Sequence, residues 1–250
     1  MKIAIVGYGI VGRATHRGLL NLTPVTIRDL GITKFNNTVI EGHDLIFVCL
    51  PTDSQEHIQL LLDECKKLSF KNPAAEIVVR STITIDTVSK LDAMRINWVY
   101  CPEFLRERYW ESDCLQRPVL IGANLKHSLL ENTIGPSYCS VVTIKEAVIT
   151  KLSVNSFNSL RVVFANHIYN LCQSVGADFE STIKQTKEHI ESNPQKYFDV
   201  NEQLRGFGGK CLPKDLDLLI SDFTKHHLTQ TLFTAIQQDN LLWPTYIRKD

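Results

Sequence analysis

The sequence predicts an α/β fold: a Rossmann-type, doubly wound, mostly parallel sheet followed by an all-α domain built on a long central helix. Three observations predict it. Short apolar runs alternate with amphipathic segments as far as Thr143, and a glycine-rich turn follows the first run. A helical pattern without proline or glycine then extends from Lys145 to Val175. Continuous apolar strands that alternate with helices are typical of a parallel sheet covered on both faces.

Each element is predicted from the period of its apolar residues. We expect strands at 2–6, 25–27, 44–50, 76–79, 97–101, 118–121 and 139–143, the last at a sheet edge. We expect helices at 10–22, 54–68, 84–94, 145–175, 179–192, 213–225 and 229–242. Gly176 is placed to end the long helix. These elements divide the chain into a dinucleotide-binding domain, 1–145, and a helical domain, 146–250.

Composition narrows the class of protein. The 250 residues carry 27 Lys and Arg against 27 Asp and Glu, and this zero net charge argues against a nucleic-acid partner. No apolar run is long enough to span a membrane, and the N-terminal run is too short for a secretion signal. The seven cysteines lack the Cys-x-x-Cys spacing and the eight histidines lack ligand spacing, so we expect reduced thiols and no metal. The expectation is a cytoplasmic protein with a small-molecule substrate.

The glycine-rich turn predicts a phosphate cradle. Gly7, Gly9 and Gly12 form a G-x-G-x-x-G pattern, with Ile10 and Val11 opening the first helix. The three glycines allow a tight turn, close approach of a pyrophosphate and close packing of helix on strand. Asp29, 22 residues after Gly7, is placed to accept a hydrogen bond from the adenosine ribose, which favours NAD over NADP. Arg28 weakens that preference, and a glycine-rich turn without a ligand is the alternative.

A second glycine-rich segment, residues 206–215, surrounds Cys211. Pro213 suits the first turn of a helix, which places Cys211 at or just before a helix N-terminus. Lys210 and Lys214 add positive charge, and both effects favour a reactive thiolate. A small buried cysteine is the alternative. With a dinucleotide nearby, a nucleophilic cysteine suggests oxidation of an aldehyde through a thiohemiacetal and a thioester.

At this point the chain resembles the nucleotide-sugar dehydrogenases, typified by UDP-glucose 6-dehydrogenase and GDP-mannose 6-dehydrogenase. The resemblance rests on segments in the family's order, of which the Gly-Phe-Gly-Gly-x-Cys-x-Pro-Lys-Asp string is the most specific. The segments are residues 7–12, 48–52, 80–82, 102–107 and 206–215, with Lys151, Asn155 and Asn166 at the family's spacing in the long helix.

The resemblance implies a four-electron oxidation of a primary alcohol to a carboxylate with two NAD⁺ per substrate. Cys211 would be the covalent nucleophile. Lys151 would stabilise the alkoxide and the oxyanion, with Asn155 donating beside it. Glu103 would act as general base for attack of water on the thioester, and Asp215 would hold a water or tune the protons of the site together with Thr82.

The resemblance also implies binding roles and a homodimer through the helical domain. The remaining cofactor-binding residues would be Leu50, Pro51, Ser81, Thr82, Glu107 and Lys214, with Lys34 on the ribose side. The sugar would be lined by Phe104, Leu105, Gly206, Phe207 and Gly208.

The sequence departs from the family in several places. Arg80 replaces the usual Lys, Cys101 replaces the usual Asn, and the stretch from Asp29 to Asp44 is short. Val148 stands where the family has an acid before the helix lysine. We also expect a short form that lacks the C-terminal domain holding the nucleotide sugar. Two alternatives remain: a single-step β-hydroxyacid-type dehydrogenase, and a non-catalytic NAD-binding protein or a subunit completed by a partner.

Overall fold

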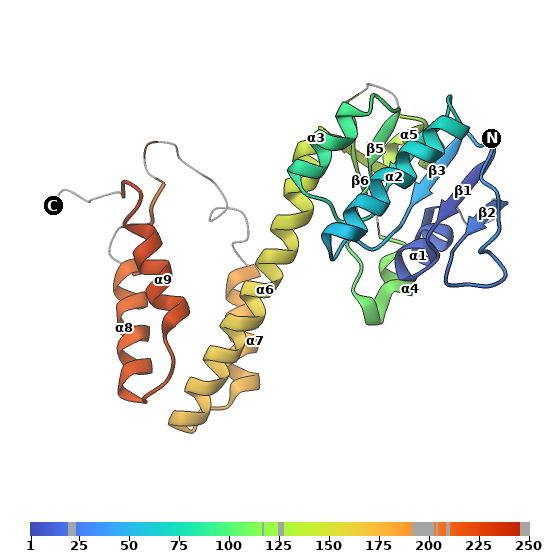
Figure 1. The fold of residues 1–250 in the computed structure, drawn as a ribbon. Coiled ribbons are helices and arrows are strands. Elements are labelled where there is room, and N and C mark those ends of the chain that lie inside the picture. Colours follow the sequence, from blue (N-terminus) through green and yellow to red (C-terminus); the bar gives the residue numbers. More distant parts are fainter. Residues whose placement is uncertain are drawn as a thin grey trace. The chain divides into compact units, whose positions relative to one another are not determined.

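The structure is a computed structural model that describes residues 1–19, 24–116, 118–124, 128–191, 203, 205–208 and 211–245 (Figure 1). The chain divides into two compact units, Met1–Asn155 and Ser156–Asp250, and we describe each by itself. The long helix α6, Ile144–Val175, begins in the first unit and ends in the second.

The first unit contains a seven-stranded sheet in the order β2-β1-β3-β4-β5-β6-β7. Neighbouring strands run parallel except at the β5–β6 contact, which is antiparallel. All seven predicted strands are present, with ends within two residues of the prediction, and β7 lies at an edge as predicted. The strands are β1 Ile3–Val6, β2 Val25–Arg28, β3 Leu45–Val48, β4 Glu76–Val79, β5 Trp98–Tyr100, β6 Val119–Gly122 and β7 Cys139–Val142.

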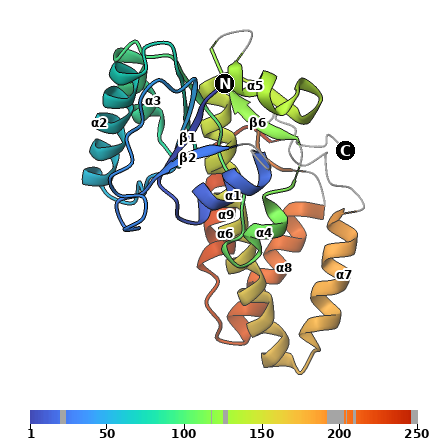
Figure 2. The same ribbon diagram turned by 90° about the vertical axis from the view of Figure 1, so that its right-hand side faces the viewer.

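Helices cover both faces of this sheet, as Figure 2 shows. Alternate residues of a strand point to opposite faces, so Ala4 and Val6 pack under α2 (Gln55–Lys71), α3 (Ile85–Ala93) and the start of α6. Ile3 and Ile5 pack on the other face, with α1 (Ile10–Leu19) and α5 (Leu129–Ile134). The doubly wound fold is therefore confirmed. Short elements that the sequence analysis did not predict are α4 (Trp110–Asp113) and the 3₁₀ turns Glu107–Tyr109 and Pro136–Tyr138.

The connection from β2 to β3, two parallel strands on either side of β1, is unusual because it contains turns and no helix. Residues 29–44 make this crossover, where parallel connections ordinarily use a helix. With no helix over it, β2 is half-buried along its whole length, whereas β1 and β3 are buried throughout. The crossover leaves room beside the end of β2, where a cavity lies.

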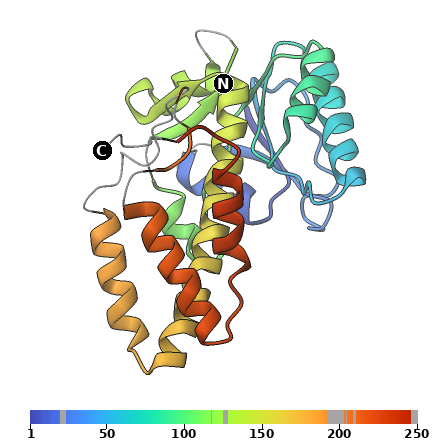
Figure 3. The ribbon, with the colours of Figure 1, turned by 90° about the vertical axis from the view of Figure 1, so that its left-hand side faces the viewer.

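The second unit is helical. It contains the end of α6 with α7 (Phe179–Glu191), α8 (Cys211–Lys225) and α9 (Thr231–Asn240). The last two lie side by side (Figure 3). Gly176, at φ +73°, ends α6 as predicted.

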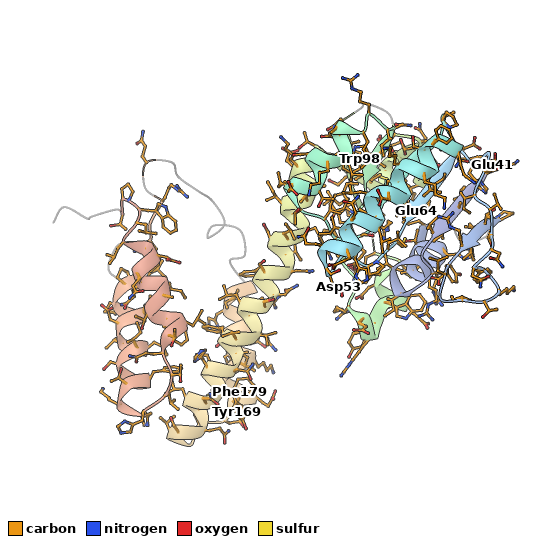
Figure 4. All side chains as sticks on the ribbon, in the orientation of Figure 1. Glu41, Asp53, Glu64, Trp98, Tyr169 and Phe179 are labelled. Carbon is orange, nitrogen blue, oxygen red and sulfur yellow. The ribbon has the colours of Figure 1, made fainter. Side chains whose placement is uncertain are left out.

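Aromatic rings join the helices of this unit. The rings of Phe223 and Phe233 lie 5.1 Å apart, and His167 of α6 packs against both. Tyr169 meets Phe179 across the α6–α7 turn, with ring centroids 5.3 Å apart (Figure 4). Within the described part of the chain, no helix is both long enough and apolar enough to cross a membrane.

Candidate functional site

The glycine turn between β1 and α1 is shaped by close backbone contacts. Gly7 has φ +88°, and a Cβ there would lie 2.4 Å from the Cys49 carbonyl oxygen. A Cβ on Gly12 would lie 2.1 Å from the Gly7 carbonyl oxygen, whereas one on Gly9 would meet nothing within 4 Å. The turn therefore excludes side chains at Gly7 and Gly12 and leaves open space at Gly9. This is the geometry that a pyrophosphate needs at a helix N-terminus.

Asp29 follows β2 directly and is tied to the same turn. Its Oδ2 accepts a hydrogen bond from the Tyr8 backbone N–H at 2.5 Å, and its Oδ1 accepts one from the Gly31 N–H at 2.8 Å. These bonds fix the carboxylate beside the glycines while leaving lone pairs that can accept from a hydroxyl group. Asp29 therefore lies beside the glycine turn, and its contact with a ribose stays a prediction.

A cavity of about 650 Å³ lies next to this carboxylate, a size typical of small-molecule sites. Its lining includes Gly7, Gly9, Asp29, Leu50 and Pro51, which were all predicted to bind the cofactor. The residues fit a dinucleotide: a cradle without side chains, an oriented carboxylate and a mostly apolar hollow. Lys34 does not line the cavity. It is exposed, with its Nζ 5.5 Å from the centre of the Phe35 ring.

The loops that follow β3 and β4 are held together by two side-chain hydrogen bonds. The Thr52 hydroxyl donates to the Thr82 carbonyl oxygen at 2.7 Å, and the Ser81 hydroxyl donates to the Leu50 carbonyl oxygen at 2.6 Å. Four residues predicted around the cofactor and the reacting atoms, Leu50, Pro51, Ser81 and Thr82, are therefore brought to the carboxyl ends of neighbouring strands. In open α/β sheets ligands bind in the crevice outside the carboxyl ends of the strands.

Glu103 and Lys151 form a buried ion pair in the first unit. Lys151 Nζ lies 2.9 Å from Glu103 Oε1 and donates a second hydrogen bond, at 2.6 Å, to the Glu103 carbonyl oxygen. The two side chains are only 3% and 16% exposed. An ammonium group has three N–H donors, so two are fixed by Glu103 and the third can serve a reacting oxygen.

Predicted neighbours of this pair surround it. The Leu105 backbone N–H donates to Glu103 Oε2 at 2.6 Å, and Lys151 Nζ lies 5.4 Å from the centre of the Phe104 ring. Asn155, one helical turn after Lys151, is exposed. Glu107 opens the short 3₁₀ turn and is exposed as well. The structure thus brings together Glu103, Phe104, Leu105 and Lys151.

Two departures from the family pattern belong to one arrangement. The buried Arg80 guanidinium donates from Nη1 to the Cys101 carbonyl oxygen at 2.9 Å and contacts the Cys101 Sγ, also at 2.9 Å. Its Nε donates to the Thr15 hydroxyl at 3.1 Å. Arg80 therefore ties β4, α1 and the residue before Pro102 together. The sequence analysis noted Arg80 and Cys101 separately and did not predict their contact.

The loop that carries Glu107 is anchored by Asp113, which sequence reasoning missed. Its carboxylate accepts hydrogen bonds from Arg106 Nε, Nη2 and backbone N–H, at 2.8–3.0 Å. Hydrogen bonding from Arg106 lowers the pKa of Asp113 from 3.8 to about 2. An aspartate in a short helix gives no sequence signal for this role, because the partner is chosen by the fold of the loop.

In the second unit the loop before α8 is clamped by Asn240 at the end of α9. The Asn240 side chain accepts from the Phe207 N–H at 2.7 Å and donates to the Phe207 carbonyl oxygen at 2.9 Å. A Cβ on Gly206 would lie 2.5 Å from the Thr245 side chain, so only glycine fits beside the clamp. Sequence reasoning missed Asn240, since a lone amide at a helix end is not distinctive.

Cys211 is the first residue of α8, which agrees with its predicted place at a helix N-terminus. Its side chain lies outside the described part of the structure, as do Gly209 and Lys210. Lys214 and Asp215 are exposed, with Lys214 Nζ 3.3 Å from Asp215 Oδ1. Gly208 is half-buried.

The other six cysteines are free thiols, four of them buried. Burial raises the pKa of both the Cys49 and the Cys65 thiols to about 12, which makes them poor nucleophiles at neutral pH. Among the described residues, no group of three His, Cys, Asp or Glu side chains is placed to hold a metal ion.

Comparison with known proteins finds a family that part of the chain resembles. Residues 145–241 match the model of the UDP-glucose/GDP-mannose dehydrogenase family, central domain. This segment is therefore similar to the family's central domain. The predicted resemblance is confirmed, and the match covers Lys151, Asn155 and the loop before α8.

Curated relatives extend the similarity over most of the chain. UDP-glucose 6-dehydrogenase of Rickettsia felis is 26% identical over 86% of this chain and 52% of its own length. GDP-mannose 6-dehydrogenase of Pseudomonas aeruginosa is 27% identical over 84% of this chain and 53% of its own length. The chain spans about half the length of the curated relatives it matches.

Solved structures share the fold. A GDP-mannose dehydrogenase from Pseudomonas aeruginosa matches 97% of this chain and 69% of its own, with a TM-score of 0.80 and 21% identity. A reductive aminase from Aspergillus terreus, solved with NADPH, matches 96% of this chain and 92% of its own, with a TM-score of 0.63 and 10% identity. These likenesses establish the architecture that the sequence predicted.

Proposed function

We propose that the protein is an NAD-dependent oxidoreductase that oxidises a primary alcohol, C6 of a nucleotide sugar such as UDP-glucose, to a carboxylate. The observation that carries the proposal is the Lys151 ammonium, buried and fixed by Glu103 with one donor left for a substrate oxygen. Fixed positive charge in a water-poor site stabilises an alkoxide or an oxyanion far better than a solvated lysine can. The glycine cradle and Asp29 support a dinucleotide as the second component.

The chain's residues divide the chemistry between them. NAD, held by Gly7, Gly9, Asp29, Leu50 and Pro51, supplies the hydride acceptor when bound. The hydroxyl proton of the alcohol passes to water, Lys151 stabilises the resulting alkoxide, and departure of the first hydride leaves an aldehyde. The Cys211 thiolate adds to the aldehyde carbon and forms a C–S bond, so that the adduct carries a second hydride that can leave. The resulting thioester is opened by water.

Hydrolysis of the thioester requires a base. Glu103 accepts the proton of the attacking water, the C–S bond breaks, and the Cys211 sulfur leaves as a thiolate. Asn155 donates to the same reacting oxygen as Lys151, while Asp215 and Thr82 hold a water. Two hydrides leave each substrate, so two NAD⁺ are reduced per carboxylate formed.

The proposal includes a cytoplasmic homodimer formed through the helical region. Leu152, Val162 and Val163 of α6 are exposed, and Val162 is 62% exposed. Apolar side chains on a long helix ordinarily pack against a partner. The nucleotide-sugar substrate is inferred from the names of relatives that are about twice as long as this chain.

The decisive experiment counts NADH per substrate. The wild-type protein is assayed with NAD⁺ and UDP-glucose, GDP-mannose and simpler primary alcohols, with the substituted variant Cys211→Ala alongside. We expect two NADH per carboxylate in the wild type and loss of the second oxidation in Cys211→Ala. The matched control Cys139→Ala, at the sheet edge, keeps the wild-type yield.

Other outcomes separate the alternatives. A yield of one NADH per substrate that does not change in Cys211→Ala identifies a single-step dehydrogenase. NAD binding without NADH from any alcohol identifies a binding protein, or a subunit if a second chain restores activity. Full double oxidation by Cys211→Ala overturns the proposed mechanism.

A further inference from the structure

Arg28 and Glu64 form an ion pair on the wall of the dinucleotide cavity. Arg28 is the last residue of β2, directly before Asp29, and Glu64 stands on α2, where Figure 4 labels it. The two side chains are 14% and 19% exposed, so the pair is largely removed from water. Arg28, Glu64 and Asp29 all line the same cavity. We propose that Glu64 determines the preference for NAD over NADP by occupying Arg28. This inference rests on the proposed dinucleotide site.

The chemistry of the guanidinium makes the pairing informative. NAD and NADP differ at the adenosine ribose, where NADP carries a phosphate in place of the 2′-hydroxyl. An arginine beside Asp29 is an obvious ligand for that phosphate, because its planar fork binds phosphate and carboxylate in the same bidentate manner. A guanidinium already engaged by Glu64 is not available to the phosphate. The Glu64 carboxylate also adds a second negative charge, besides Asp29, to the lining of the cavity.

The rest of the cavity increases the importance of this one carboxylate. Lys67 and Lys71 line the same wall, one and two turns further along α2 than Glu64. Without Glu64, the cavity would hold three cationic side chains against the single carboxylate of Asp29. The local charge would then favour a phosphate. The preference for a hydroxyl-bearing ribose is therefore expected to depend on a helix as well as on the end of β2.

The test is a binding titration, which needs no turnover. Dissociation constants for NADH and NADPH are measured by cofactor fluorescence in the wild type and in Glu64→Gln. Glutamine keeps the shape of glutamate but removes its charge, which frees Arg28. A charge-assisted contact contributes enough that we expect the NADPH-to-NADH ratio of dissociation constants to fall by about tenfold or more.

Two further variants isolate the cause. Asp63→Asn removes a carboxylate from the exposed face of the same helix and should leave the ratio unchanged. The double variant Arg28→Gln with Glu64→Gln removes both partners and should return the ratio to the wild-type value. The double variant also tests the inference if Glu64→Gln alone does not fold. If the double variant gains affinity for NADPH, Arg28 is not the group that binds the phosphate and the inference is wrong.

Failure of the inference and failure of the proposed function give different results. If the wild type binds NADH and Glu64→Gln leaves the ratio unchanged, the inference is wrong and the dinucleotide site stands. If folded wild-type protein binds neither dinucleotide, the site itself is wrong and the inference falls with it. A ratio shifted equally by Asp63→Asn also overturns the inference, since the effect would then be one of net charge.

Discussion

The two units of the chain bury their apolar side chains to very different degrees. In the α/β unit both faces of the sheet are covered, and large side chains such as Phe47 and Tyr100 are fully buried. In the helical unit the buried apolar side chains that the structure describes are Cys172, Ile183, Phe223 and Phe233. A core of this size contributes little hydrophobic stabilisation. The first unit therefore contains its own core, whereas most apolar side chains described in the second unit are only partly covered.

The chemistry is divided along the same line. The buried lysine and the glycine cradle belong to the α/β unit, and the proposed nucleophile begins a helix of the other unit.

The largest effect is expected at Lys151. Substitution of Lys151 by Met removes the only charge that the mechanism offers to the alkoxide, and we expect turnover to fall by about 10²–10³. The control is Lys145→Met, an exposed lysine earlier on the same helix, which should keep wild-type turnover. Steady-state NADH production measures both. A Lys151→Met variant with unchanged turnover would remove this lysine from the mechanism.

Alanine substitutions in the glycine turn should affect the stability of the fold and the binding of NADH separately. In Gly7→Ala the new Cβ meets the Cys49 carbonyl oxygen at a positive φ, so we expect the α/β unit to lose at least about 2 kcal/mol of stability. In Gly9→Ala the Cβ enters open space, so stability should hold while NADH binding weakens. Thermal unfolding and NADH titration of both variants make the comparison. Equal stability in the two variants contradicts the role given to Gly7.

The exposed apolar surface of α6 should respond to charge. Val162→Glu would place a carboxylate in the proposed dimer contact, and burying an unpaired charge is costly. We expect the dimer dissociation constant to rise by about tenfold or more. Sedimentation of Ser181→Glu, which adds the same charge at an exposed polar position of α7, provides the control. A monomeric wild-type protein would contradict the proposed homodimer.

The smallest effect concerns acid stability of the α/β unit. Because hydrogen bonding from Arg106 holds the pKa of Asp113 at about 2 instead of 3.8, the ionised carboxylate stabilises the fold above pH 3.8. That contribution is lost as the pH falls from 3.8 through 2. Asp113→Asn should therefore melt below the wild type at pH 7, and the gap should close toward pH 2. Circular dichroism melts across this range measure it, and a gap independent of pH would exclude the ionic contribution.

Most of the α/β unit could be predicted from its sequence because local patterns determine it. Continuous apolar runs mark the buried strands, and Ser54 and Thr84, placed at the starts of predicted helices, cap α2 and α3. The turns at 136–138 and the short α4 escaped prediction, since single turns have no period to detect.

The candidate site was predictable as a set of residues, and its internal bonds were not. Motif spacing indicates Gly7, Asp29 and Lys151 individually. The contacts that hold the site, such as Arg80 with Cys101 and Asn240 with Phe207, join side chains to backbone groups far away in sequence. The tertiary fold determines which backbone carbonyl or amide lies within hydrogen-bond distance of a given side chain. A local sequence pattern therefore cannot predict these partners.

The helix-free crossover between β2 and β3 has a mechanical consequence. Because β2 is a half-buried edge strand, its amides should open to solvent exchange more readily than those of the buried strands β1 and β3. The last residue of this strand, Arg28, and the residue after it, Asp29, both line the cavity. A ligand held there would brace this edge of the sheet, so occupancy of the cavity and rigidity of β2 should rise together.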